Sequence, residues 1–267
     1  MEIQCKNCGN GYGSGFAYCP YCGQKSATSR INLKRLLGEI WIALTDVDKG
    51  ILRLVKDLST RPGVVAREYV AGKRKKYLNP FSYLFLMVAV AFFMIVKFED
   101  VALAQLDPVA LSRFDSGATN KEFLQYSFRY FNIFIFLMCP VNGLIVWLFF
   151  RKNGYNYAEN TVLAAYLSGQ TMFFYCILLV PFFIFPGTIP VLGIICGLLL
   201  SIWYIIGILQ FHHTRTAGAI VRAILVILVS QLASQQLLYA GFELQRAPLE
   251  QSIPPPTTIR PSDSTVR

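Results

Sequence analysis

Four cysteines near the start of the chain have the spacing of a metal site. Cys5 and Cys8 form one C-x-x-C-G motif, and Cys19 and Cys22 form a second one after ten intervening residues. Two thiolates three positions apart reach one ion when the backbone between them turns tightly, and the glycine after each pair permits the positive φ that such a turn needs. Four sulfurs complete the closed tetrahedral set of a structural zinc site. We therefore predict one structural zinc ion on Cys5, Cys8, Cys19 and Cys22, in a zinc-ribbon module over residues 1–27.

The same cysteines have three alternative interpretations: two disulfides, a redox pair or an iron–sulfur cluster. No βαβ pattern surrounds either motif, which disfavours a thioredoxin-like pair. Disulfides are disfavoured if this end of the chain lies in the reducing cytoplasm. With four protein ligands a zinc ion has no open position for water, so we expect no catalysis at the metal. Cys139, Cys176 and Cys196 lie in apolar segments, where we expect small buried hydrophobes.

The composition identifies the environment of the chain. Of its 267 residues 54% are apolar and only 15% are charged, yet the formal net charge is +10. A soluble domain carries about 25% charged residues, so a water-soluble globular enzyme is disfavoured. We find no convergent set of nucleophile, base and acid, and we predict a non-enzymatic protein with no catalytic residue. The expected fold is all-α, a polytopic membrane helical bundle with a small N-terminal zinc ribbon.

Four stretches without Asp, Glu, Lys or Arg define the predicted transmembrane domain, residues 77–242. They are residues 77–96, 130–150, 160–214 and 223–242. A membrane-spanning helix needs about 20 apolar residues, so the 55-residue third stretch must be a hairpin that turns at Pro186-Gly187-Thr188-Ile189-Pro190. This predicts five transmembrane helices, near 79–97, 130–150, 162–185, 190–211 and 221–240. His212 and His213 follow the fourth span, in an expected hydrated loop.

The charges of the connections predict the orientation. Residues 1–76 hold 14 of the 25 basic residues and 6 of the 15 acids. Because basic loops stay on the cytoplasmic side, the N-terminus is expected to be cytoplasmic and the C-terminus periplasmic or extracellular. The Pro-rich segment 243–267 is expected to be a disordered tail. Residues 1–24 lack the apolar run of a signal peptide, and we expect a multi-pass protein of the bacterial inner membrane.

Residues 28–76 are predicted to form basic, amphipathic cytoplasmic helices. Apolar residues recur at helical spacing over 31–44 and 51–58, and Arg61-Pro62-Gly63 separates a helix from a further one that Pro62 opens and Gly72 ends. The basic run Lys73, Arg74, Lys75 and Lys76 precedes the first span. It fits a positive-inside signal with ordinary packing, which we favour, or a site for anionic lipid head groups. Nucleic acid is the least favoured partner, because the bases lie at the bilayer surface.

Several of these residues together resemble a known family. They are Arg61-Pro62-Gly63, Arg67-Glu68-Tyr69, Gly72-Lys73-Arg74, Tyr77 and the run from Asn79 to Phe85. This block resembles an uncharacterised bacterial membrane-protein family, domain of unknown function 3667, over roughly residues 5–97. The resemblance implies an N-terminal zinc ribbon followed by several membrane helices. It implies no activity or substrate.

Apart from Lys97 and Arg222 at their ends, the predicted spans contain amides and hydroxyls but no Asp, Glu, Lys or Arg, which disfavours proton-coupled transport and intramembrane proteolysis. Gly193, Gly197 and Ser201 repeat at four-residue spacing, which favours close helix packing, within the chain rather than in a homo-oligomer. We predict a membrane adaptor or assembly factor that docks a protein partner through its zinc ribbon. The alternative is a transporter or channel-like component for a small or lipid-like solute. The polar residues within the spans are Asn132, Asn142, Ser168, Gln170, Thr171, Ser201, Gln210, Ser230, Gln231, Ser234, Gln235 and Gln236.

Overall fold

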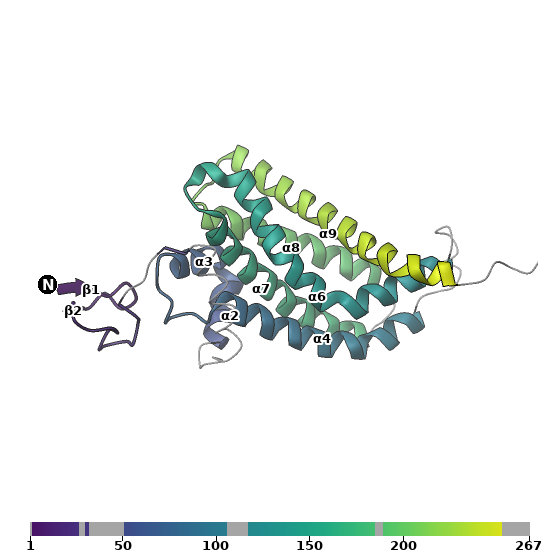
Figure 1. Cartoon of the computed structure of the whole chain (residues 1–267), viewed down its shortest axis with the longest axis horizontal. Helices are drawn as coiled ribbons and strands as arrows, with labels where there is room; N and C mark the ends of the chain where they lie inside the picture. The colour runs from purple at the N-terminus through teal and green to yellow at the C-terminus, as the bar shows by residue number, and fades with distance from the viewer. Residues whose placement is uncertain (1, 27–29, 32–50, 106–116, 185–188, 253–267) are drawn as a thin grey trace, which may run out of the picture.

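The computed structural model describes residues 2–26, 30–31, 51–105, 117–184 and 189–252. Most of the predicted amphipathic run over 31–44, the hairpin turn at 186–188 and the tail beyond 252 lie outside the described residues. Two short strands and a set of helices form the described part (Figure 1). The elements are β1 (Glu2–Gln4), β2 (Gly11–Gly13), α2 (Ile51–Thr60), α3 (Pro62–Val70), α4 (Pro80–Gln105), α6 (Gly117–Phe150), the 3-10 turn η1 (Arg151–Asn153), α7 (Tyr157–Ile184), α8 (Ile189–Phe211) and α9 (Ala217–Ser252).

Five long helices form a membrane bundle. Within α6, α7, α8 and α9 lie apolar segments of 19 to 30 residues with mean hydropathy between 1.6 and 2.4, long enough to cross a bilayer. The fifth, in α4, is shorter over its described side chains, Pro80–Val96. Leucine, isoleucine and phenylalanine side chains are exposed along the outer faces of these helices, as lipid contact requires. The chain is therefore a multi-pass, all-α membrane protein.

Helix α7 lies at the centre of the bundle. More than half of its apolar segment is buried (56%), against 17% in α9. It packs against α4 and α6 along its length and contacts α2, α3 and α8. The close approach of α7 to α4 and α6 depends on glycines, which have no Cβ. A Cβ added to Gly169 would lie 2.8 Å from the ring of Tyr83 in α4, and one added to Gly143 of α6 would lie 2.5 Å from Thr161. Small residues thus set the spacing of the central three helices.

The N-terminal module and the short helices lie at one end of the bundle, which we call the near end (Figure 1). Here α6 and α8 end and α4, α7 and α9 begin. The break that Arg61-Pro62-Gly63 predicts is confirmed: α2 ends at Thr60, α3 begins at Pro62 and Gly72 follows with a φ of +111°. A Cβ on Gly63 would lie 2.1 Å from the carbonyl oxygen of Gly207, so α3 crosses α8 at backbone contact.

The short helices pack beside the membrane helices rather than beneath them. The indole Nε1 of Trp203, two turns before the end of α8, donates to the carbonyl of Ser59 at 3.1 Å. The amide of Gln170, almost four turns into α7, donates to the Ser59 hydroxyl at 3.0 Å and accepts from the Tyr83 hydroxyl. Gln170 is fully buried. The corner between α2 and α3 is therefore part of the core of the bundle.

Three helices extend well beyond the predicted spans, and one of them, α4, continues to Gln105 instead of ending near 97. Helix α6 begins at Gly117 instead of near 130, and α9 continues to Ser252 instead of ending near 240. Residues 243–252 are therefore helical, where the sequence predicted the start of the disordered tail. The ring of Phe123 lies 5.4 Å from that of Phe242, edge to face, and Tyr126 lies 5.6 Å from it. These aromatic contacts stabilise both helices beyond the apolar segments.

Candidate metal centre and candidate membrane cavity

The four N-terminal cysteines converge on one point. Their Sγ atoms all lie within 4.8 Å of one another, with Cys5 and Cys22 at 3.6 Å and Cys8 and Cys19 at 3.7 Å. These distances far exceed the ~2.05 Å of a disulfide. Tetrahedral ligands at ~2.3 Å from one zinc ion lie ~3.8 Å from each other. The cluster therefore has the dimensions of a site that holds a single metal ion.

The local backbone explains why the sulfurs converge. Each motif closes a tight turn, in which the Gly9 amide donates to the Cys5 carbonyl and the Gly23 amide to the Cys19 carbonyl, both at 2.9 Å. Gly9 and Gly23 have φ values of +80° and +71°, in the left-handed region where a Cβ is strained. The antiparallel strands β1 and β2 pair on either side of the first turn. The spacing C-x-x-C-G thus produces two similar turns whose thiols face one another.

The thiols influence each other's ionisation. Burial opposes ionisation of Cys5, but hydrogen bonds from the backbone of Cys8 and Asn7 outweigh it and lower the pKa of Cys5 to about 6. A hydrogen bond from the Asn10 backbone favours the thiolate of Cys8, yet burial and the neighbouring thiols together raise the pKa of Cys8 to about 12. Four thiolates at this spacing repel one another. A cation among them removes that repulsion, so the arrangement suits a metal ion.

Gln24 attaches the cysteine module to the segment before α4. Its side chain is 5% exposed, and its Nε2 donates to the Gly72 carbonyl at 3.1 Å while its Oε1 accepts from the Lys75 amide at 2.9 Å. One side-chain amide thus satisfies both a backbone donor and a backbone acceptor that lie about 50 residues further along the chain. The contact joins the second cysteine turn directly to the near end of the bundle.

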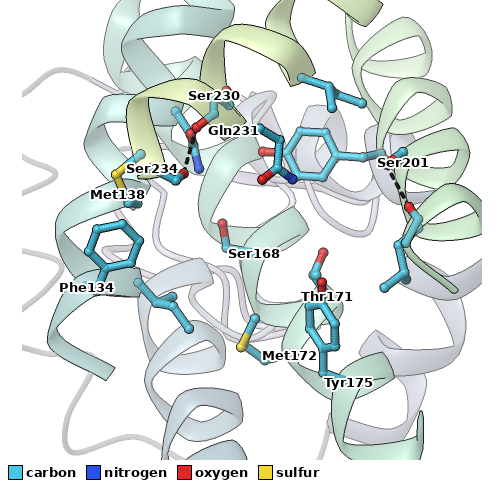
Figure 2. Close-up of a pocket in the computed structure, with 16 residues that line it drawn as sticks. Phe134, Met138, Ser168, Thr171, Met172, Tyr175, Ser201, Ser230, Gln231 and Ser234 are labelled. Carbon is cyan, nitrogen blue, oxygen red and sulfur yellow. Dashed lines mark hydrogen bonds between the residues drawn. The ribbon is translucent and has the colours of Figure 1, made fainter. Parts of the chain in front are cut away.

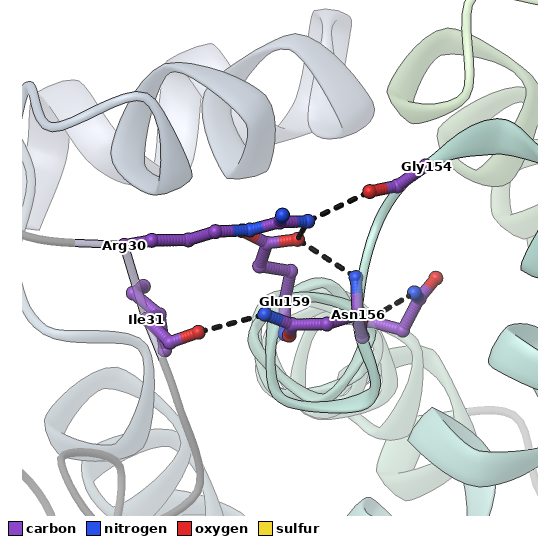
Figure 3. Close-up of polar contacts among 6 residues, drawn as sticks. Arg30, Ile31, Gly154, Asn156 and Glu159 are labelled. Atoms are coloured by element: carbon purple, nitrogen blue, oxygen red, sulfur yellow. Dashed lines mark hydrogen bonds and ion pairs between the residues drawn. The ribbon is translucent and has the colours of Figure 1, made fainter.

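A second attachment lies at the start of α7 (Figure 3). Asn156 and Glu159 form a capping box: the Glu159 amide donates to Asn156 Oδ1 and the Asn156 amide to Glu159 Oε2. Arg30 binds the same carboxylate with two hydrogen bonds, at 2.7 and 2.9 Å, and also donates to the Gly154 carbonyl. Next to it, the fully buried Ile31 accepts from the Asn156 side chain through its carbonyl.

The basic run predicted as a lipid site is partly neutralised within the protein. Lys73 and Lys76 both bind Glu68, at 3.0 and 2.8 Å, and the Tyr77 hydroxyl donates to the same carboxylate at 2.6 Å. Burial opposes ionisation of Glu68, but these donors outweigh it and lower its pKa to about 2. The guanidinium of Arg74 lies over the Tyr69 ring. Two of the four predicted lipid residues are therefore committed to an internal acid.

A partly open cavity of about 230 Å³ lies halfway along the bundle, lined by residues of α6, α7, α8 and α9 (Figure 2). Many of the polar residues that the sequence places within the spans line it, and among the described residues no Asp, Glu, Lys, Arg or His does so. The aromatic rings of Phe134, Tyr175 and Tyr204 complete its wall. The polar residues are Asn142, Ser168, Thr171, Ser201, Ser230, Gln231 and Ser234.

Several polar groups of the cavity present free acceptors. Thr171, Ser201 and Ser234 each donate their hydroxyl hydrogen to the carbonyl four residues earlier in their own helix, at 2.6 to 2.8 Å. Their lone pairs remain available to a ligand. The Oδ1 atom of Asn142 is buried and has no hydrogen-bond partner among the described residues. The cavity is therefore suited to a molecule that donates hydrogen bonds.

The repeat of small residues in α8 has a different role from the predicted one. A Cβ added to Gly193 or Gly197 would meet no described atom within 4 Å. These glycines therefore make no close helix contact with the described residues of the chain, and packing against a second copy stays a prediction. Gly197 and Ser201 instead line the cavity, where short side chains leave space. The described glycines at close helix contacts are Gly63, Gly143, Gly169, Gly207 and Gly241, which no repeat marks in the sequence.

His212 is buried, although the sequence indicated a hydrated loop. Its ring is 4% exposed, stacks on Phe150 with centroids 4.5 Å apart and contacts Tyr155 edge to face. Burial, together with the charge of Arg222, lowers its pKa to about 3, so the ring stays neutral at physiological pH. His213, next in the chain, is exposed as expected. The aromatic residues that surround His212 come from distant segments, which is why its burial was missed.

Comparison with known proteins identifies one segment. No curated protein and no solved structure matches the chain. Residues 48–92 match the family described as "Protein of unknown function (DUF3667)". The match covers α2, α3, the Glu68 cluster and the first half of α4, including the residues that place the α2–α3 corner in the bundle core. The resemblance is confirmed over residues 48–92, which are similar to this family of unknown function, within an integral membrane protein of unknown activity.

Proposed function

We propose that the protein is a channel-like membrane component that binds a small uncharged solute in the cavity among α6, α7, α8 and α9. The observation that carries the proposal is the lining: amides and hydroxyls gather at mid-height of the bundle, while no acid, base or histidine is present. Membrane transporters typically bind their substrates near the bilayer midplane. A charged solute is disfavoured because nothing in the lining compensates its desolvation.

The chemistry of the solute follows from the lining. Hydroxyl lone pairs and the Oδ1 atom of Asn142 call for O–H or N–H donors on the ligand. A volume of about 230 Å³ lies below the ~300–1,000 Å³ of pockets for drug-sized ligands. The class that fits is a small polyol or amide, of which glycerol and urea are convenient probes.

Flux into liposomes tests this proposal. The purified chain is reconstituted, and glycerol or urea entry is followed by light scattering after an osmotic step. We expect entry faster than in protein-free liposomes, lost on Ser201→Leu, which fills the cavity. Leu198→Phe is the matched control, since Leu198 is 62% exposed on the outer face of the same helix and should leave flux intact. Rates equal to those of protein-free liposomes for both solutes would refute the proposal.

A protein-docking role through the N-terminal module is the second candidate. Phe16, Tyr18 and Tyr21 are 58%, 58% and 66% exposed, although the module is attached to the bundle through Gln24. Exposed aromatic side chains on a rigid support are typical anchors for a protein partner. A photo-crosslinking amino acid at Tyr21 should yield one discrete product in cells, lost on Cys8→Ser. Products unchanged by Cys8→Ser would argue against docking by the folded module.

We propose zinc as the ion and the cytoplasm as its compartment. Four sulfurs at the edge lengths of a single-ion tetrahedron support zinc over a cluster of several irons. Basic residues concentrate at the near end, which supports a cytoplasmic N-terminus in a bacterial inner membrane. Metal analysis of the purified chain and reporter tags at the two termini test these two statements; tags on the same side would contradict the five-span threading. The basic residues described at the near end include Arg30, Arg53, Lys56, Arg61, Arg67, Lys73, Arg74, Lys75, Lys76, Arg151, Lys152, Arg215 and Arg222.

A further inference from the structure

A second hollow lies at the near end, on the side where α3 crosses α8. Its volume is about 700 Å³, and its wall has two halves of opposite character. Val64 of α3 and Ile206 and Leu209 of α8 form an apolar half. Arg67 of α3, Gln210 at the end of α8, and His213, Thr214 and Arg215, which follow α8, form a polar half. We call this hollow the α3–α8 groove.

The polar half carries two guanidinium groups and no acid. Among the described residues no carboxylate pairs with Arg67 or Arg215 and none lines the groove. Nη1 of Arg67 donates to the Gln210 carbonyl at 2.5 Å, which fixes the guanidinium at the end of α8. The Thr214 hydroxyl oxygen is buried and has no hydrogen-bond partner among the described residues. Two planar cations and a hydroxyl donor are the groups that bind a phosphate.

The level of the groove in the membrane indicates the source of the phosphate. The apolar segment of α8 ends at Phe211, so Ile206 lies on the membrane side of this boundary while Thr214 and Arg215 lie beyond it. Ile206 is 43% exposed and lines the α3–α8 groove. A free phosphate ion would make no favourable contact with the apolar half of the groove. A phospholipid places its phosphate at the boundary and its acyl chain along the apolar surface.

We propose that the α3–α8 groove binds one anionic phospholipid, with its phosphate between Arg67 and Arg215 and an acyl chain against Val64 and Ile206. This site is distinct from the basic run before α4, where Glu68 neutralises Lys73 and Lys76. The proposal is independent of the solute cavity and of the zinc ion, because it shares no residue with either.

Native mass spectrometry of the full chain in detergent tests the site with phosphatidylglycerol and phosphatidylcholine as probes. We expect one retained phosphatidylglycerol and weaker retention of phosphatidylcholine. Arg215→Gln should weaken phosphatidylglycerol binding by about fivefold or more, the effect of one basic contact. Thr214→Val should also weaken it, although the net charge is unchanged. Lys152→Gln, at an exposed position in η1, removes the same charge and should leave binding unaltered.

Three outcomes would overturn the proposal. Equal losses for Lys152→Gln and Arg215→Gln would indicate general attraction to the basic end rather than a built site. Equal retention of the two lipids would mean that the groove does not select a negative charge. Displacement of phosphatidylglycerol by millimolar inorganic phosphate would show that the phosphate group alone is bound, without a contribution from the acyl chain.

Discussion

Replacing Gln24 by alanine should release the cysteine module from the bundle without unfolding it. The substitution leaves the Gly72 carbonyl and the Lys75 amide without their partner. Each lost partner in a buried contact costs about 1–2 kcal/mol, so the docked state should lose about 2–4 kcal/mol. Since 1.4 kcal/mol is a tenfold change, the undocked population should rise roughly 30- to 700-fold.

Two measurements on the purified protein report this release. Hydrogen exchange of the peptide that contains Lys75 should accelerate, and trypsin should cleave faster at the neighbouring Lys73–Lys76 run. Lys25→Ala is the control, because Lys25 is the next residue and is exposed. Bound metal should be unchanged in both variants. If Gln24→Ala matched Lys25→Ala in exchange and cleavage, the module would not be held by this amide and the reasoning would be wrong.

Three further perturbations test the packing, the acid cluster and the metal. Gly63→Ala should lower the thermal midpoint by the equivalent of about 1–3 kcal/mol of overpacking, because its Cβ would meet the Gly207 carbonyl; Gly193→Ala, which meets no described atom, should not. Glu68→Gln should destabilise the protein by about 2 kcal/mol at neutral pH. Because the pKa of Glu68 is lowered from 4.5 to about 2, the difference between wild type and this variant should shrink as pH falls from about 4.5 to 2; a difference independent of pH would exclude the ion pairs as its cause. Chelation or Cys8→Ser should unfold the first 26 residues, a loss on the order of 10 kcal/mol of metal-coupled folding, while far-ultraviolet circular dichroism shows the helical bundle unchanged. One zinc per chain in a double variant, Cys8→Ser with Cys22→Ser, would reject the cysteine site.

The sequence predicts best what depends on neighbouring residues. The cysteine turns are local, because each pair and its glycine lie within five positions. The membrane helices are also local in this sense, since an uninterrupted apolar run determines each one. The ends of α6 and α9 were missed because they depend on Phe123 meeting Phe242, a contact between two helices that the charge pattern does not record.

Contacts between distant segments account for the other differences. Gly63 and Gly207 are 144 positions apart, and neither stands in a repeat that indicates a helix crossing. In the sequence Gln170 is one of several polar residues within a predicted span, yet in the structure its side-chain amide forms hydrogen bonds with both Ser59 and Tyr83. His212 follows an apolar run and precedes a polar loop, so only the surrounding rings of Phe150 and Tyr155 determine that it is buried.

The bond between Arg30 and Glu159 bears on the order of events during synthesis. Domains near the N-terminus emerge from the ribosome first and can fold at once, so the cysteine module can acquire its ion while most of the chain is still unmade. Arg30, however, meets its partner 129 residues later, at the start of the third long helix. Helix α3 can pack in its final position only later still, because its contact Gly207 lies near the end of the fourth long helix, α8. We therefore expect biogenesis in two stages: early folding of the cysteine module, and later closure of the near end, once α7 and α8 have entered the bilayer.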